Sequence, residues 1–94
     1  MNSLDLQSRP ALAARVRMQV DVVTGEPVLL YPEGILILNP TAHEIVSRCD
    51  GKMSVEELIR RLCDEYEESE ETLRQDVLAT LADLKQRNLI TLAP

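Results

Sequence analysis

The stretch "ILIL", residues 35–38, places four large aliphatic side chains in succession within a chain of 94 residues. If it forms a strand, alternation sends Ile35 and Ile37 to one face of a sheet and Leu36 and Leu38 to the other. A chain of this length has only enough helix to cover one face of a small sheet. We therefore expect either that the helices wrap toward both faces or that part of this strand belongs to a site that a partner completes.

Composition indicates one small globular domain. Apolar residues make up 45% of the chain, and Trp and Phe are absent, so the core must consist of Leu, Ile, Val and Ala side chains. No apolar run approaches the roughly 20 residues of a membrane helix, and the first residues lack the pattern of a secretory signal. We expect a cytoplasmic protein without a membrane partner, with residues 1–12 as a flexible tail and residues 13–94 as a single domain.

The net charge of -6 resides between residues 56 and 76, where nine acidic residues face three arginines. Such a surface repels phosphate backbones, so we expect no nucleic-acid partner. Either the acidic run is a solvated helix face, or it is a docking patch for a basic partner.

Periodicity divides the chain into strands followed by helices. Residues 14–21 alternate between apolar and polar, Gly25 and Pro27 mark a turn, residues 28–31 form a second strand, and "PEG" leads into residues 35–38. Short connections favour antiparallel neighbours, which predicts a three-stranded meander. From Asn39 the period becomes helical, with the first helix capped by Asn39 or starting one step later at a capping box of Thr41 and Glu44.

Two further helices follow, the second beginning at a Ser54–Glu57 capping box and the third capped by Ser69. Asn88 is a left-handed stop, after which residues 89–92 give a short strand. Each helix has an apolar stripe that we expect to be buried: Ala42, Ile45, Val46 and Cys49; Val55, Leu58, Ile59, Leu62 and Tyr66; Leu73, Val77, Leu81 and Leu84.

The predicted fold is α+β and winged helix-turn-helix-like: a three-stranded antiparallel meander, three helices and a short C-terminal strand. In a DNA-binding protein the start of the third helix would contact bases, but here it carries Glu70, Glu71 and Asp76. We therefore retain the architecture and reject the DNA-binding role.

Residues that could carry chemistry are few. His43 has no nucleophile or acid at the spacing of a catalytic triad. Cys49 and Cys63 are fourteen residues apart, and we expect both to be buried, reduced thiols. A zinc site needs more ligands than these, and the glycines provide no phosphate-binding loop. We expect no metal, no cofactor and no catalytic residue, so this chain is not an enzyme by itself.

If the third strand lies at the edge of the sheet, its free N–H and C=O groups can accept an extended peptide by strand addition. Pairing with a second copy of the chain, giving a homodimer, is the competing way to satisfy the same edge.

The order and spacing of several short motifs resembles the pyrroloquinoline quinone (PQQ) biosynthesis protein PqqD family over about residues 9–92. These motifs are "RVRM" with Asp21, "VLLYPEG" (28–34), "LN" (38–39), "CDG" (49–51) and "DVLxxLxxL" (76–84). The resemblance implies a small peptide chaperone, a recognition element for ribosomally made, modified peptides. Members bind the precursor peptide PqqA and present it to the radical-SAM enzyme PqqE, which crosslinks its Glu and Tyr side chains.

The resemblance also implies a peptide-binding site, because related domains add the leader peptide antiparallel to the third strand and against the third helix. On this sequence the site comprises Ile35, Leu36, Ile37, Leu38 and Asn39 on the strand and Arg74, Val77, Leu78 and Leu81 on the helix. Leu78 is informative, because it lies off the main buried stripe. Register decides which strand residues face the groove.

Binding the leader and the enzyme at once requires two surfaces. We place the enzyme contact on the acidic segment, at Glu67, Glu68, Glu70 and Glu71. The alternative function is a homodimeric interaction module or a winged-helix regulator that binds no peptide.

Overall fold

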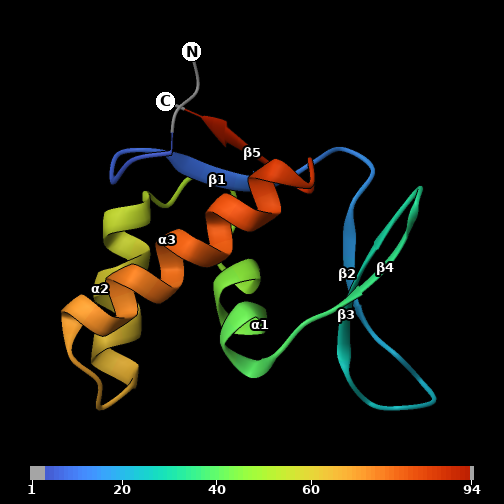
Figure 1. The fold of residues 1–94 in the computed structure, drawn as a ribbon, viewed down its shortest axis with the longest axis horizontal. Helices are drawn as coiled ribbons and strands as arrows, with labels where there is room; N and C mark the ends of the chain where they lie inside the picture. The colour runs from blue at the N-terminus through green and yellow to red at the C-terminus, as the bar shows by residue number, and fades with distance from the viewer. Residues whose placement is uncertain (1–3, 94) are drawn as a thin grey trace.

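The computed structural model describes residues 4–93. In chain order the elements are β1 (Arg9–Leu12), β2 (Arg17–Val20), β3 (Pro27–Tyr31), β4 (Gly34–Ile37), α1 (Pro40–Ser47), α2 (Val55–Glu65), α3 (Glu70–Gln86) and β5 (Ile90–Ala93). β2, β3 and β4 form an antiparallel sheet in that order, and β1 pairs with β5. The three-stranded sheet lies at one end of the molecule and the helices at the other (Figure 1). The predicted α+β fold, with its meander, three helices and C-terminal strand, is confirmed.

Each helix begins at the cap residue that the sequence indicates. The side chains of Asn39, Ser54 and Ser69 accept hydrogen bonds from the backbone N–H of the third residue of α1, α2 and α3, at 2.7, 3.1 and 3.1 Å respectively. These contacts satisfy N–H groups that have no partner within the helix. Asn39, rather than Thr41, is the cap of α1, with Pro40 at the first helical position.

The core is aliphatic and is built from the predicted helix stripes. The four stripe residues of α3 are buried, as are Val55, Leu58, Ile59 and Leu62 of α2. The prediction for Tyr66 is wrong: 44% of its surface is exposed. α2 ends at Glu65 and Tyr66 has extended backbone angles, so its side chain no longer follows the helical period. None of the helices within residues 4–93 has the length and apolar character needed to span a bilayer.

The sequence predicts a flexible tail over residues 1–12, but part of this segment is a strand that packs against the rest of the domain. Residues 9–12 form β1, whose Pro10 is buried opposite Leu92 of β5. The carbonyl groups of Ser8 and Leu6 accept hydrogen bonds from the first two N–H groups of α2, at 2.9 and 3.0 Å. The segment therefore pairs with the far end of the chain and completes the cap of α2, contacts that no local pattern indicates. Residues 1–3 of the expected tail lie outside the described residues.

The helices cover one face of the three-stranded sheet. Leu29 and Leu38 are part of the core, and Leu36 packs against it. Ile35 and Ile37 point to the opposite face and are 63% and 62% exposed. The structure excludes the first of the two alternatives that the "ILIL" stretch left open, because one face of this strand has no helix over it within the described residues.

Asn88, the residue that ends the chain's helical path after α3 in a left-handed conformation, gives a test of the fold. Asn88 has a φ of 62°, in the left-handed region. Asn88→Val should lower the free energy of unfolding by about 1–2 kcal/mol, because a β-branched side chain is strained there. Asn88→Gly is the matched control and should be nearly neutral, since glycine adopts this conformation freely. Guanidinium unfolding curves measure both variants, and equal stabilities would contradict the strain argument.

Candidate functional site

β4 is an edge strand of its sheet. It pairs with β3 through the register Val28↔Ile37 and Leu30↔Ile35, and a two-residue turn at Pro32 and Glu33 joins the two strands. Among residues 4–93 no strand pairs with the other side of β4. This edge is the feature on which the expected peptide site depends, and no described strand covers it.

The hydrogen-bond pattern shows which backbone groups of β4 are free. The N–H of Leu38 donates to the carbonyl of Pro27 at 3.0 Å. In an antiparallel ladder the bonding direction alternates, so Leu36 and Leu38 bond to β3. The N–H and C=O groups of Ile35 and Ile37 therefore point to the open edge. These two residues combine exposed apolar side chains with backbone groups that no neighbouring strand satisfies.

The predicted helix residues fall into two groups. Val77 and Leu81 are completely buried, so they support the site from the core and cannot themselves contact a peptide on the surface. Leu78 is half-buried and Arg74 is exposed, with its guanidinium 3.4 Å from the carboxylate of Glu70. Leu36 and Leu78 both pack on the edge of the core. Asn39 is exposed, and its side chain is used as the cap of α1.

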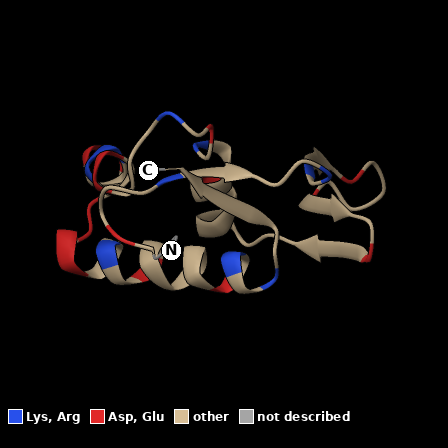
Figure 2. Ribbon diagram, turned by 90° about the horizontal axis from the view of Figure 1, so that it is seen from above, with Lys and Arg blue, Asp and Glu red and all other residues tan. Residues whose placement is uncertain are grey.

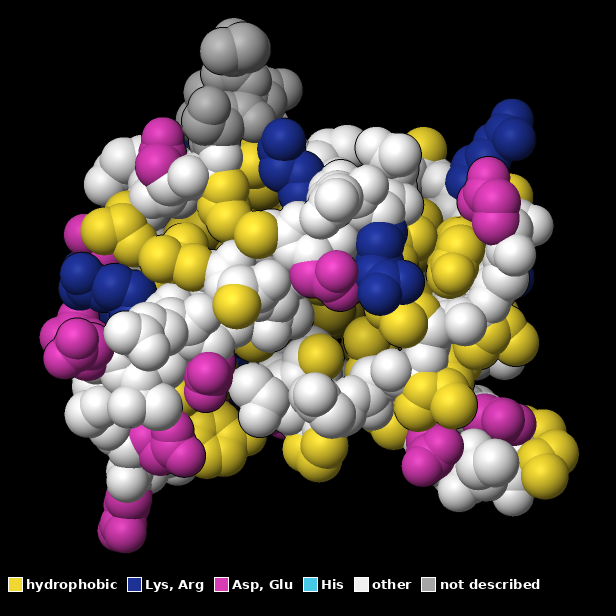
Figure 3. All heavy atoms as spheres, in the orientation of Figure 1, with side chains coloured by type: hydrophobic (Ala, Val, Ile, Leu, Met, Phe, Trp, Pro, Cys, Tyr) yellow, Lys and Arg dark blue, Asp and Glu magenta, His cyan; other side chains and the backbone are white. Residues whose placement is uncertain are grey.

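α3 and β4 lie along the same side of the molecule (Figure 2). The space-filling view from this side shows apolar side chains gathered in a hollow between α3 and the sheet (Figure 3). The two elements that carry the expected site therefore face the same side of the molecule, and Leu36 of β4 and Leu78 of α3 both pack against the core.

The expected enzyme-contact residues are all on the surface. Glu67, Glu68, Glu70 and Glu71 are exposed, in the link between α2 and α3 and in the first turn of α3. Glu70 forms the ion pair with Arg74.

Cys49 is a buried titratable group away from this edge. Burial raises the pKa of the Cys49 thiol to about 12, and the charge of Asp50 adds to the effect, so this thiol stays protonated at neutral pH. Within the part of the chain that the structure describes, no group of three His, Cys, Asp or Glu side chains is arranged to hold a metal ion. What the geometry provides is a binding surface.

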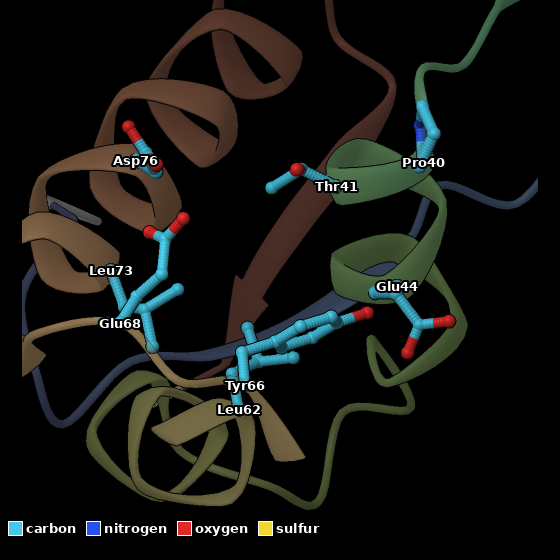
Figure 4. A pocket seen from close by; sticks show the side chains of 8 residues that line it. All are labelled: Pro40, Thr41, Glu44, Leu62, Tyr66, Glu68, Leu73 and Asp76. Carbon is cyan, nitrogen blue, oxygen red and sulfur yellow. The ribbon is translucent and has the colours of Figure 1, made fainter. Parts of the chain in front are cut away.

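Sequence reasoning missed one feature, a cavity of about 110 Å³ between the three helices. Its wall includes Thr41 of α1, Tyr66 after α2 and Asp76 of α3 (Figure 4). These residues come from three separate elements, so no spacing along the chain could have indicated that they meet.

This geometry defines the class of protein: a small winged-helix-like domain with an open edge strand. Comparison with known proteins supports the same class. The family model for coenzyme PQQ synthesis protein D (PqqD) matches residues 26–90. A "PqqA binding protein" of Xanthomonas oryzae pv. oryzae is 34% identical over 92 residues, covering 98% of this chain and 100% of that protein. Another, of Rhodopseudomonas palustris, is 35% identical over 84 residues, covering 89% and 82%.

A solved structure is also similar: the solution NMR structure of the PqqD truncation of Methylobacterium extorquens PqqCD. It matches with a TM-score of 0.80 and 27% identity over 95% of each chain. That protein is described as a functional, stand-alone recognition element for ribosomally synthesized and post-translationally modified peptides. The chain belongs to the PqqD family.

Amide hydrogen exchange tests the open edge. The amides of Ile35 and Ile37 should exchange at least about tenfold faster than those of Leu36 and Leu38, because only the latter two bond to β3. NMR exchange rates at neutral pH measure all four. Equal protection along the strand would contradict the assigned direction of the backbone groups.

Proposed function

We propose that this chain is a peptide chaperone of PQQ biosynthesis that binds the precursor peptide PqqA as an added strand on β4. The observation that carries the proposal is the open edge at Ile35 and Ile37, where free backbone groups coincide with exposed apolar side chains. The similarity to relatives named "PqqA binding protein" supports the choice of peptide.

Strand addition explains how a small domain binds an extended peptide. Ile35 and Ile37 each offer one backbone donor and one acceptor to the peptide, and these bonds provide affinity with little dependence on sequence. Side chains of the peptide then alternate between two surfaces. Those opposite Leu36 point toward α3 and Leu78, whereas those opposite Ile35 and Ile37 lie on the outer face. Specificity arises from apolar contacts on both faces.

The domain contributes proximity rather than chemistry. We infer that it presents the bound peptide to the radical-SAM enzyme PqqE, through exposed acidic residues just before α3 and in its first turn, Glu67, Glu70 and Glu71. Holding the peptide and the enzyme together turns a bimolecular encounter into a tethered one, which gains roughly 10² to 10⁴ in avidity. In this mechanism all bond-forming steps belong to the enzyme.

The same edge favours a second candidate, a homodimer in which β4 pairs with β4 of another copy. Exposed apolar residues on an unpaired strand support self-association as well as peptide binding. The two functions differ in their response to peptide, because a dimer formed through β4 leaves no edge free.

The edge is tested by proline substitution. Ile37→Pro removes an N–H that points away from β3, so the sheet should survive while PqqA affinity falls at least about tenfold. Val20→Pro is the matched control. The N–H of Asp21 donates to Glu26, so the N–H of Val20 points to the opposite edge of the sheet, and peptide affinity should be unchanged. Calorimetric titration with synthetic PqqA measures affinity, and circular dichroism checks the fold.

Equal PqqA affinity of Ile37→Pro and the wild-type chain would refute strand addition on β4. A loss confined to Val20→Pro would move the site to β2. If the wild-type chain sediments as a dimer that Ile37→Pro dissociates, and PqqA does not bind, the homodimer replaces the chaperone.

The enzyme contact has its own test. Glu67→Lys with Glu71→Lys should weaken the binding of PqqE about tenfold or more, because both side chains are exposed acids in the proposed contact. Glu26→Lys with Glu56→Lys changes the net charge equally at a distant surface and should have little effect. Surface plasmon resonance with immobilised PqqE compares the pairs. Unchanged affinity of the first pair would exclude this placement.

A further inference from the structure

The cavity between the helices lies directly after β4 in the chain. Pro40 and Thr41, at the start of α1, form one wall, and Pro40 is three residues beyond Ile37. Three residues span at most about 10 Å. A peptide that extends past the end of β4 therefore reaches the cavity within a few residues.

The cavity has an apolar floor. Leu62 of α2 and Leu73 of α3 line it, and both are almost completely buried. The ring of Tyr66 covers the side next to them (Figure 4). Such a floor accommodates an alkyl chain, because burial of methylene groups against these side chains is favourable.

The rim of the cavity is acidic. Glu44, Glu68 and Asp76 are its charged residues, and among the described residues that line it none is basic. Arg48 pairs with Glu44 at 2.9 Å. Within residues 4–93 neither Glu68 nor Asp76 forms an ion pair, so two carboxylates at the opening lack a counter-charge.

The ionisation of Tyr66 agrees with this charge distribution. Its pKa is raised, first by desolvation and then by the nearby carboxylates of Glu44 and Glu65, which the charge of Arg48 only partly offsets. The phenol therefore stays neutral at physiological pH, and its ring presents a face that attracts a cation.

We propose that this cavity binds one lysine or arginine side chain of the precursor peptide, with the alkyl stem on Leu62, Leu73 and Tyr66 and the cation between Glu68 and Asp76. The inference rests on the proposed function and adds a specificity determinant to it. Long cationic side chains combine an apolar stem with a charged head, which matches the apolar floor and acidic rim.

The position of this side chain in the peptide follows from geometry. β4 runs from Gly34 toward Asn39, and both strand pairs in its sheet are antiparallel. A peptide strand that also pairs antiparallel with β4 runs in the direction opposite to β4. Its N-terminal end therefore lies beside Asn39 and Pro40. The cationic residue is therefore N-terminal to the peptide residues that pair with Ile35 and Ile37.

A double-mutant cycle tests the proposal. On the protein side, Glu68→Gln with Asp76→Asn removes the two unpaired charges, and Glu26→Gln with Asp64→Asn is a control of equal charge at exposed residues outside the cavity. On the peptide side, synthetic PqqA carries norleucine in place of each Lys or Arg in turn, which keeps an alkyl stem and removes the charge. Calorimetry at low ionic strength measures all combinations, and thermal unfolding verifies that the variants fold.

We expect the cavity variant and one norleucine peptide each to lose about fivefold in affinity, and their combination to lose no more than either alone. The replaced residue should lie N-terminal to the pairing segment, and the loss should shrink as salt rises. Independent, multiplicative losses, an equal loss in the control pair, or no effect of any norleucine substitution would overturn the proposal.

These outcomes separate the inference from the function on which it rests. If Ile37→Pro abolishes binding while the cycle shows no coupling, strand addition stands and the cationic pocket is wrong. If wild-type protein does not bind PqqA, both are wrong.

Discussion

The constraint on which the structure depends is the uneven cover of one three-stranded sheet. Its inner face packs on the helices through Leu29 and Leu38, whereas its outer face leaves Ile35 and Ile37 in solvent. In the other sheet β1 pairs with β5, and β5 also contacts α3. As a result, the free backbone groups of β4 have no partner within the described chain. An unpaired edge of this kind is costly to leave exposed and well suited to receive a strand.

Backbone pairing alone would accept many extended peptides, so selectivity must come from side chains around the edge. The outer face offers Ile35 and Ile37, the inner face offers Leu36 and Leu78, and the acidic cavity lies beyond the end of β4. In the proposed complex, the outer and inner faces bind alternate apolar side chains of the peptide, and the acidic cavity binds one cationic side chain. In that complex a small domain would discriminate among peptides through three surfaces that surround one strand edge.

Local physics made most elements predictable. Asn39, Ser54 and Ser69 are caps because their side chains can bond to N–H groups three residues later, a relation that is visible in sequence. The buried stripe of α3 follows from its period. The errors come from contacts between distant parts of the chain. Residues 9–12 form a strand only because residues 90–93 provide its partner.

The sequence by itself determined the class of fold and the starts of α2 and α3, and it left two choices for the start of α1, because caps, turns and periodicity act over a few residues. It also indicated Leu78 as a residue off the buried stripe. Only the tertiary structure decided that Ile35 and Ile37 face outward, that Val77 and Leu81 are inaccessible, and that Thr41, Tyr66 and Asp76 share a cavity. The physical reason is that exposure and proximity are set by packing between elements, which depends on the whole chain at once.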